Sequence, residues 1–575
     1  MKSLISTVLS ILVISWSLGA QGYRVAVLPV EFSDIGFEDK AADVDNKVNR
    51  AQVYFNDQFH PHRNFSFELL PTVRLPRNMA WYGSNTTSGK DERIGSAVRE
   101  ACTQSGGSFS VYDNDGDGYI DIVCLITAGG SEAEGDGVFC IWPQQGYMHD
   151  RGGTFSIGGK TVDCFMVCPG KSGLGTFCHE FAHHFGLQDL YDTDNNGSGG
   201  TTKGVWGSVS LMDRGLENNG GDTPPNFCAI ELEQLGIGNP VEAGEGVITL
   251  RPVSRSKEYL RLESDVPDEY FLLECRDRSG WDAYSGGAGL LVYHIDRSSN
   301  NSWYSDYYRR NLSASERWQN NQVNCRPDHQ CARIVEAVPN SASLETVFFP
   351  QEGRTSLASD TDPAFRFWSG TTSSQAVCGI EKLSDGSIRF RIITPISIED
   401  NSVFQDAAIL NWSTDPSLSV KECQVSWSTV SGQSGSGSAT VQPTEEGRFS
   451  LIIEGLSPAT SYRTVIKAVC QDGAVYSETV SFTTKSSQKG VRPFIYLNVE
   501  GRLPDGSFQT GSKLPLRVYN AQEALKVEWY FDEEKISADA SGFWRPLMSG
   551  TLKARVYYED GSTDVIIKQI RVAHE

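Results

Sequence analysis

The stretch that decides the fold is FCHEFAHHFGLQDLYD, from Phe177 to Asp192. It holds three of the nine histidines of the chain within six positions. His179 and His183 are four residues apart, so on a helix their imidazoles lie on one face, about one turn apart. Two imidazoles in that arrangement can bind one zinc ion. The stretch therefore predicts a helix that carries a metal site.

The residues after the second histidine can complete a catalytic zinc site. Gly186 has the backbone freedom to end the helix in a left-handed turn. The chain can then double back and bring Asp189 to the same ion as a third ligand. Three protein ligands leave one position open for water, which is typical of catalytic rather than structural zinc.

Glu180 follows the first histidine and lies about 100° further around the helix, near the ion without binding it. A carboxylate in that place can act as the general base toward the attacking water. His184 points off the ligand face, so we expect it to be solvated or to support the site rather than to bind the metal. A surface helix with incidental histidines is the alternative. Chance HExxH matches in a chain of this composition should number only about 0.01.

The motif HExxHxxGxxD, which runs from His179 to Asp189, resembles that of the metzincin metallopeptidases. Within them it is similar to the immune inhibitor A family of secreted bacterial proteases, and the likeness covers about residues 22–395. The resemblance implies a metzincin-like catalytic domain of α/β (α+β) type. It also implies a methionine turn beneath the zinc, for which Met212 in VWGSVSLMDRG is the candidate, and hydrolysis of peptide bonds in extracellular proteins.

Two other classes of function stay open. A non-enzymatic surface adhesin on a protease-like scaffold would be favoured by a broken metal site, yet every residue of the motif is present. A zinc hydrolase that cuts other amides, such as cell-wall components, is not excluded by the sequence.

The stretch DNDGDGYID, from Asp113 to Asp121, is typical of the first part of a calcium-binding loop. It departs from an EF-hand because Cys124 stands where a glutamate would complete the ligand set. We expect a structural calcium site here, with a solvated acidic turn as the alternative. The expected ligands are Asp113, Asp115, Asp117, Tyr119 and Asp121. Asp192 and Asp194 form a weaker acidic cluster of the same kind.

The 575 residues exceed what one hydrophobic core supports, so we expect several domains. A formal charge of −22 repels phosphate backbones, so no nucleic-acid partner is expected. The apolar run at residues 4–18, followed by Gly19 and Ala20, predicts a secretory signal rather than a membrane anchor, because a span needs about 20 residues. We expect a secreted, surface or periplasmic monomer without a transmembrane segment, acting on protein or peptide.

The pattern of elements predicts five segments, ending in all-β modules. They are a signal peptide at 1–20, the catalytic domain at 21–240, an all-β domain at 241–395, a fibronectin type III-like domain at 396–486 and an immunoglobulin-like β-sandwich at 491–575. The last two could contact a surface or a glycan. Thirteen cysteines fit an oxidising compartment, and the expected disulfides are Cys325 with Cys331 and Cys423 with Cys470.

Overall fold

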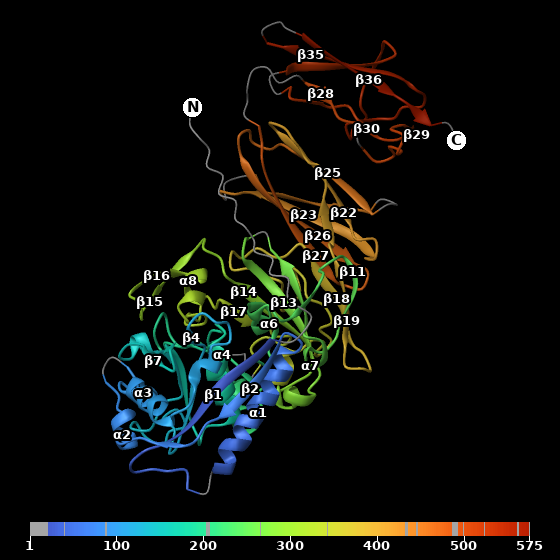
Figure 1. The fold of residues 1–575 in the computed structure, drawn as a ribbon. Helices are drawn as coiled ribbons and strands as arrows, with labels where there is room; N and C mark the ends of the chain where they lie inside the picture. Colours follow the sequence, from blue (N-terminus) through green and yellow to red (C-terminus); the bar gives the residue numbers. More distant parts are fainter. Residues whose placement is uncertain are drawn as a thin grey trace. The chain divides into compact units, whose positions relative to one another are not determined.

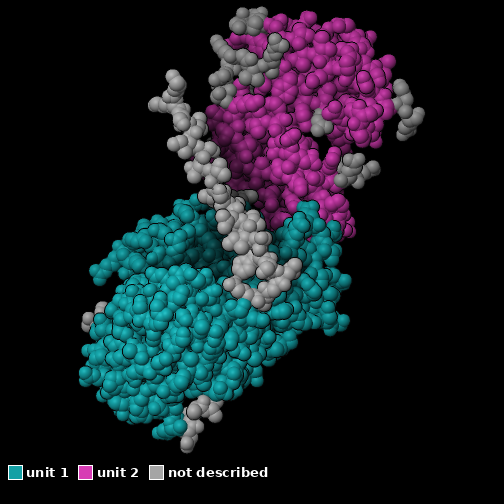
Figure 2. Space-filling model, viewed as in Figure 1, with its two compact units in different colours: residues 1–356, 367–369, 378–391 teal, residues 357–366, 370–377, 392–575 magenta. Residues whose placement is uncertain are grey.

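The computed structural model describes residues 21–573 except 39–40, 87–88, 203–206, 265, 342, 432–434, 444–446, 486–492, 498, 522–523 and 560–562. The predicted signal segment therefore lies outside the described residues. Within these ranges no helix has the length and apolarity that a membrane span requires. The chain forms two compact units (Figure 2). Unit 1 comprises residues 1–356, 367–369 and 378–391, and unit 2 comprises residues 357–366, 370–377 and 392–575.

A six-stranded sheet forms the centre of the N-terminal part of unit 1 (Figure 1). The strand order is β2-β1-β5-β9-β6, with β3 also paired to β1. All pairs are parallel except the one that β6 makes at the edge. The strands are β1 (Gln21–Glu31), β2 (Arg63–Leu69), β3 (Val73–Arg74), β5 (Val123–Thr127), β6 (Gln144–Tyr147) and β9 (Cys164–Pro169).

Alternate residues of β1 enter two different cores, as the side-chain period of a strand requires. Val25 and Val27 belong to one core, and Ala26 and Leu28 belong to the other. The helices α1 (Ala41–Phe59) and α4 (Leu174–His183) pack in the first core, whereas α3 (Ile94–Ser105) packs in the second. Both faces of the sheet are therefore covered by helices, which agrees with the α/β (α+β) type that the resemblance implied.

The remainder of unit 1 is built mainly of strands. A second sheet has the order β10-β12-β13-β14-β17, and β15 and β16 form a separate hairpin. These strands are β10 (Asn239–Val241), β12 (Glu258–Glu263), β13 (Glu269–Arg276), β14 (Gly289–Asp296), β15 (Ser302–Ser305), β16 (Arg310–Ser313) and β17 (Ala332–Ile334). Smaller elements are β4 (Tyr119–Ile120), β7 (Phe155–Ile157), β8 (Lys160–Val162), β11 (Gly246–Leu250), β18 (Ala376–Lys382), β19 (Ile388–Ile393), α2 (Met79–Tyr82), α5 (Asn218–Gly221), α6 (Ala229–Leu235), α7 (Val253–Ser256) and α8 (Ala314–Gln319).

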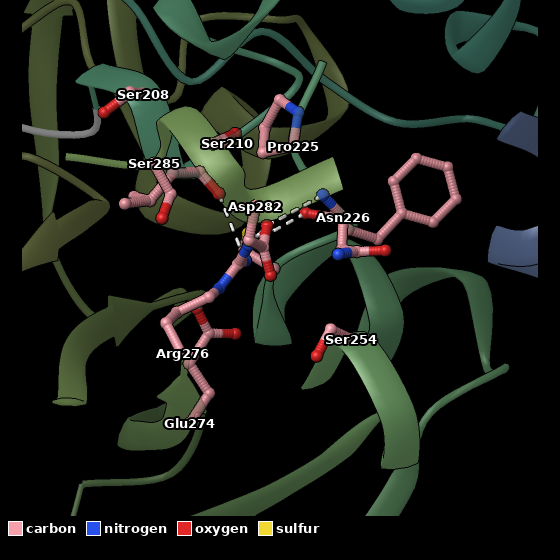
Figure 3. Close-up of polar contacts among 12 residues, drawn as sticks. Ser208, Ser210, Pro225, Asn226, Ser254, Glu274, Arg276, Asp282 and Ser285 are labelled. Atoms are coloured by element: carbon pink, nitrogen blue, oxygen red, sulfur yellow. Dashed lines mark hydrogen bonds and ion pairs between the residues drawn. The ribbon is translucent and has the colours of Figure 1, made fainter. Parts of the chain in front are cut away.

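A buried ion cluster joins the second sheet to the segments that follow the HExxH motif (Figure 3). Arg276 of β13 is completely buried, and its Nε donates to Glu274 Oε1 at 2.9 Å. Its two terminal nitrogens donate to Asp282 Oδ1 at 2.5 Å and to the carbonyl of Val209 at 3.1 Å. Glu274 also accepts from the N–H of Ala229, the first residue of α6. The N-terminal and C-terminal parts of unit 1 thus share one polar network.

Unit 2 contains a β-sandwich followed by a second all-β region. The sandwich packs Trp412 and Tyr462 in its core, and the Tyr462 hydroxyl accepts from the N–H of Ser457 at 2.9 Å. Its strands are β20 (Ile396–Ile398), β21 (Ser402–Val403), β22 (Ala407–Thr414), β23 (Val420–Thr429), β24 (Gly437–Val441), β25 (Arg448–Glu454), β26 (Ser461–Cys470) and β27 (Val475–Thr483).

The second region packs Trp529 in its core. Its main sheet has the order β33-β32-β35-β36, and the described residues of this region also form three two-stranded sheets. The strands are β28 (Phe494–Ile495), β29 (Phe508–Gln509), β30 (Leu514–Pro515), β31 (Val518–Tyr519), β32 (Ala524–Phe531), β33 (Glu534–Ile536), β34 (Phe543–Trp544), β35 (Gly550–Tyr558), β36 (Thr563–Ile570) and β37 (Val572–Ala573). Figure 1 labels several of them.

The expectation of two disulfides is wrong for this structure. Cys325, Cys331 and Cys423 carry free buried thiols, so neither expected pair is joined in the described part of the chain. In the ladder between β23 and β26, Cys423 lies opposite Ala468 rather than Cys470. Diagonal neighbours of that kind are about 7–8 Å apart, too far for a disulfide. Two cysteines on neighbouring strands can form a disulfide only if the register places them opposite each other, and the sequence does not reveal that register.

Candidate active site

The helix α4 delivers the two histidines and then reverses the chain. It ends at His183, and Gly186 follows with a φ of 86°, the left-handed conformation that its place in the motif predicted. The N–H of Gly186 donates to the carbonyl of His183 at 2.9 Å, which closes the turn. The chain thereby returns to the helix with Asp189. One ligand atom from each of His179, His183 and Asp189 lies within 4.8 Å of the others.

The two imidazoles present the same nitrogen to the aspartate. Asp189 Oδ1 lies 3.1 Å from His179 Nε2 and 3.4 Å from His183 Nε2. His179 Nδ1 donates to the carbonyl of Leu211 at 3.0 Å, and His183 Nδ1 donates to the carbonyl of Leu187 at 2.8 Å. Because a carbonyl oxygen can only accept, each Nδ1 carries a hydrogen. The Nε2 atoms are therefore the ones available to a metal.

These three residues fit a zinc ion. All three side chains are largely shielded from solvent, with exposed fractions of 4%, 15% and 8%. Asp189 Oδ1 is buried and accepts no hydrogen bond among the described residues, although it faces both imidazoles. A buried carboxylate oxygen without a donor is costly, and a bound cation would satisfy it. Two imidazole nitrogens and one carboxylate oxygen form a donor set that zinc accepts.

The charges of the cluster are coupled. Burial opposes charge on His183, but the Asp189 carboxylate outweighs it and raises the pKa of His183 to about 9. Burial likewise opposes charge on Asp189, yet the two imidazoles hold the pKa of its carboxyl well below the usual range. The buried carboxylate therefore favours positive charge at this place, and a metal ion bound there would supply that charge instead of a protonated imidazole.

Glu180 lies beside the cluster, on the same helix. Its Oε2 accepts from the backbone N–H of Gln145 in the edge strand β6 at 2.9 Å, and the residue is 8% exposed. Burial raises the pKa of the Glu180 carboxyl, while the imidazoles of His179 and His183 lower it, and burial prevails. The carboxyl is thus fixed on one side by the edge strand and lies near the candidate metal ligands.

The segment around Met212 is bonded to the site on two sides. Met212 is completely buried, and its carbonyl accepts from the N–H of Leu190 at 2.8 Å. The preceding carbonyl, that of Leu211, accepts from His179. Glu231 of α6 in turn accepts from the N–H of Met212 at 3.1 Å. This turn therefore supports both the first histidine and the residue that follows Asp189.

Three residues that hold the site have no counterpart in the sequence expectations. They are Gln145, Glu231 and Asn321. Asn321 donates from Nδ2 to Asp189 Oδ2 at 2.7 Å, and its Oδ1 accepts from the N–H of Asp189 at 2.7 Å. No periodicity or spacing marks these residues, because each acts through a partner distant in the sequence.

His184 lies off the ligand face, as expected, but it is not solvated. Its Nε2 lies 2.6 Å from the hydroxyl of Tyr23, and its Nδ1 lies 3.5 Å from the sulfur of Cys164. Burial lowers the pKa of His184 to about 4. The imidazole is therefore neutral near pH 7 and joins α4 to strands β1 and β9.

The acidic loop brings together three of its aspartates. Carboxylate oxygens of Asp113, Asp115 and Asp117 lie within 4.8 Å of one another. The ammonium of Lys160 lies 2.6 Å from Asp113 and competes with any cation for it. Asp121 takes another role, because its carboxylate accepts from the hydroxyl of Tyr23 and the N–H of Asn114. Tyr119 begins β4, and its N–H donates to Asp117.

The weaker acidic cluster also converges. Asp192 and Asp194 place their carboxylates within 4.8 Å of the Cys325 sulfur. Most of their oxygens already accept hydrogen bonds, from the N–H groups of Thr202 and Asp194 and from the hydroxyl of Ser198.

Comparison with known proteins finds a peptidase family whose model matches the segment that carries this site. Residues 29–233 match the model described as immune inhibitor A peptidase M6, catalytic domain. The chain is 27% identical over 271 residues to the pre-pro-metalloprotease PrtV of Vibrio cholerae serotype O1, covering 39% of this chain and 29% of that protein. It is 26% identical over 198 residues to immune inhibitor A of Bacillus thuringiensis subsp. alesti, covering 28% of each. The chain thus spans less than a third of the length of these relatives.

Among solved structures, the fn3 domain of human collagen alpha-1(XX) matches 17% of this chain and 88% of its own length, with 22% identity and a TM-score of 0.15.

The family match contains the whole HExxHxxGxxD motif and Met212. Residues 29–233 of this chain are therefore similar to the catalytic domain of the immune inhibitor A (M6) peptidase family, as the resemblance of the motif predicted.

Proposed function

We propose that this chain is a zinc-dependent endopeptidase that hydrolyses peptide bonds of extracellular proteins. The observation that carries the proposal is the buried convergence of His179, His183 and Asp189, with a carboxylate oxygen left without a donor between the two imidazoles. The match of the surrounding domain to a peptidase family supports it, as do the relatives described as metalloproteases.

The roles of the side chains follow from their chemistry. A zinc ion held by the three residues would acidify a water molecule and polarise the carbonyl of the peptide bond to be cut. Glu180 is the general base, which takes the proton from the attacking water and passes it to the leaving amine. The N–H of Gln145 engages Oε2 of Glu180, which leaves Oε1 for the proton.

The environment of Glu180 suits that role. Burial raises the pKa of its carboxyl, so the carboxylate is a stronger base than a solvated glutamate. A base works best when its pKa lies near the operating pH, because it is then both ionised and able to hold the proton. The two imidazoles lower the pKa of Glu180 and oppose part of the rise that burial causes.

Two further proposals concern the surroundings of the site. Asp113, Asp115 and Asp117 bind a structural calcium ion, supported by the convergence of their carboxylates and by the preference of calcium for oxygen ligands. The chain is exported, supported by the apolar segment at its N-terminus, and its substrate is an extracellular protein.

A cleavage assay on a diverse peptide library tests the function. The purified chain should cut internal peptide bonds, lose this activity in a chelator that binds zinc, and regain it when zinc is restored. Cleavage that persists in the chelator would refute the metal dependence. Activity toward cell-wall amides, with none toward peptides, would favour the other class of zinc hydrolase.

A further inference from the structure

The third residue of the proposed zinc site is fastened by a side chain far downstream. Asp189 donates its backbone N–H to Oδ1 of Asn321 at 2.7 Å. In return, Nδ2 of Asn321 donates to Oδ2 of the Asp189 carboxylate at 2.7 Å. The two residues are 132 positions apart, and Asn321 lies beyond the segment that matches the peptidase family. One amide therefore makes a pair of hydrogen bonds to one metal-binding residue.

This pair of bonds decides which carboxylate oxygen faces the imidazoles. Oδ2 is engaged by Asn321, whereas Oδ1 lies 3.1 Å from His179 Nε2 and 3.4 Å from His183 Nε2. Oδ1 is also buried and accepts no hydrogen bond among the described residues. We propose that Asn321 is a positioning residue of the zinc site, which holds Asp189 so that its Oδ1 faces the two imidazoles that would bind the ion with it. This inference rests on the proposed function.

The downstream segment is hydrogen-bonded to the loop that carries Asp189. Asn321 has a φ of 52°, a left-handed conformation that asparagine adopts more readily than most residues. Its carbonyl accepts from the hydroxyl of Thr193 at 2.8 Å. Asn324, which is completely buried, donates to the carbonyl of Leu190 at 2.7 Å. The segment thus contacts the loop at three places, so the position of Asn321 is determined by more than its own bonds to Asp189.

The chemistry explains why an amide occupies this place. The amide offers one acceptor to the N–H and one donor to the carboxylate, and it carries no charge. An aspartate could accept from the N–H but would face the Asp189 carboxylate without a donor. Partners that orient a metal ligand contribute about 10–100-fold to metal affinity. The residues needed for zinc affinity therefore extend beyond the catalytic domain into the β-rich part of unit 1.

The test compares zinc affinity in full-length chains that also carry Glu180→Ala, which prevents self-cleavage. Zinc dissociation constants are measured by competition with a chromogenic chelator. Asn321→Gly removes both hydrogen bonds and tolerates the left-handed backbone, so it should weaken zinc binding about 10–100-fold. Asn321→Asp should weaken it at least as much. Asn320→Ala is the matched control, because Asn320 Nδ2 bonds the carbonyl of Glu316 instead; its affinity should change less than threefold.

The inference would be overturned if both Asn321 variants bound zinc within threefold of the parent chain. Far-UV circular dichroism verifies that each variant is folded, and if Asn321→Gly fails to fold, the isosteric Asn321→Asp decides the outcome. A parent chain that binds no zinc would overturn the proposed function as well. The two failures are therefore distinguishable in one series of titrations.

Discussion

Arg276→Met removes the cation from the buried cluster of Figure 3 and leaves its two carboxylates in place. The side chains of Arg276, Glu274 and Asp282 are all 0% exposed, so water cannot replace the lost guanidinium. Removing one partner of a buried ion pair costs about 3–5 kcal/mol, because the remaining charge is uncompensated. The carbonyl of Val209 also loses its donor. We expect a loss of about 3–5 kcal/mol in the free energy of unfolding.

Urea unfolding, monitored by intrinsic fluorescence, measures this loss. The matched control is Arg251→Met, which breaks the bridge between Arg251 and Glu258, where the arginine side chain is 66% exposed. Exposed bridges contribute about 0–1 kcal/mol, so the control should remain close to the wild type. The triple variant Arg276→Met, Glu274→Gln, Asp282→Asn should recover part of the loss, because no buried charge remains. A single variant within 1 kcal/mol of the wild type, or a triple variant less stable than the single one, would refute the reasoning.

Three further predictions concern stability. Burial raises the pKa of Asp91 to about 7. The contribution of this side chain to the free energy of unfolding is therefore present at low pH and is lost as the pH rises through 7. In urea titrations, the free energy of unfolding of Asp91→Asn should therefore rise by about 2–4 kcal/mol relative to that of the wild type between pH 5 and pH 8. A difference between the two chains that stays constant over this range would contradict the prediction. A Cβ at Gly175 of α4 would lie 2.0 Å from a backbone oxygen, so Gly175→Ala should lower the melting temperature. Gly244→Ala, where a Cβ meets no described atom within 4 Å, should leave it nearly unchanged, and equal shifts would count against the steric argument. Calcium at a hundredfold excess over Kd should add about 2.7 kcal/mol to the free energy of unfolding. Asp115→Ala with Asp117→Ala should abolish this gain. If calcium leaves the melting curve of the chain with the intact loop unchanged, the loop is only a solvated acidic turn.

The parts of the site that sequence could predict are the local ones. The spacing of His179 and His183 fixes a shared helix face, and Gly186 marks the left-handed reversal, because both depend on helix geometry within one or two turns. Asp189 follows from the same short reversal. The expected α/β (α+β) class of this domain agrees with the structure, in which a mostly parallel sheet carries helices on both faces.

The remaining parts depend on contacts between distant segments. Asn321 bonds Asp189 across 132 positions of the sequence. The carboxylate of Glu231, which lies on α6, accepts from the N–H of Met212. Asp121 leaves the acidic cluster for Tyr23, a residue of β1 that lies 98 positions upstream. None of these pairs has a periodic or spaced pattern in the sequence. The expected disulfide between Cys423 and Cys470 failed for the same reason, since the register of the two strands decides which residues lie opposite each other.

The most direct measurement of the central claim determines zinc content and peptide turnover on one preparation of Glu180→Ala. We expect about one zinc ion per chain, as in the wild type, because the three proposed metal ligands are untouched. We also expect turnover to fall by at least about 10²–10⁴-fold, the contribution of a positioned general base. A variant that retains zinc and near-normal turnover would contradict the role of Glu180. A wild-type chain that cuts peptides at full rate without any bound metal would contradict the zinc site itself.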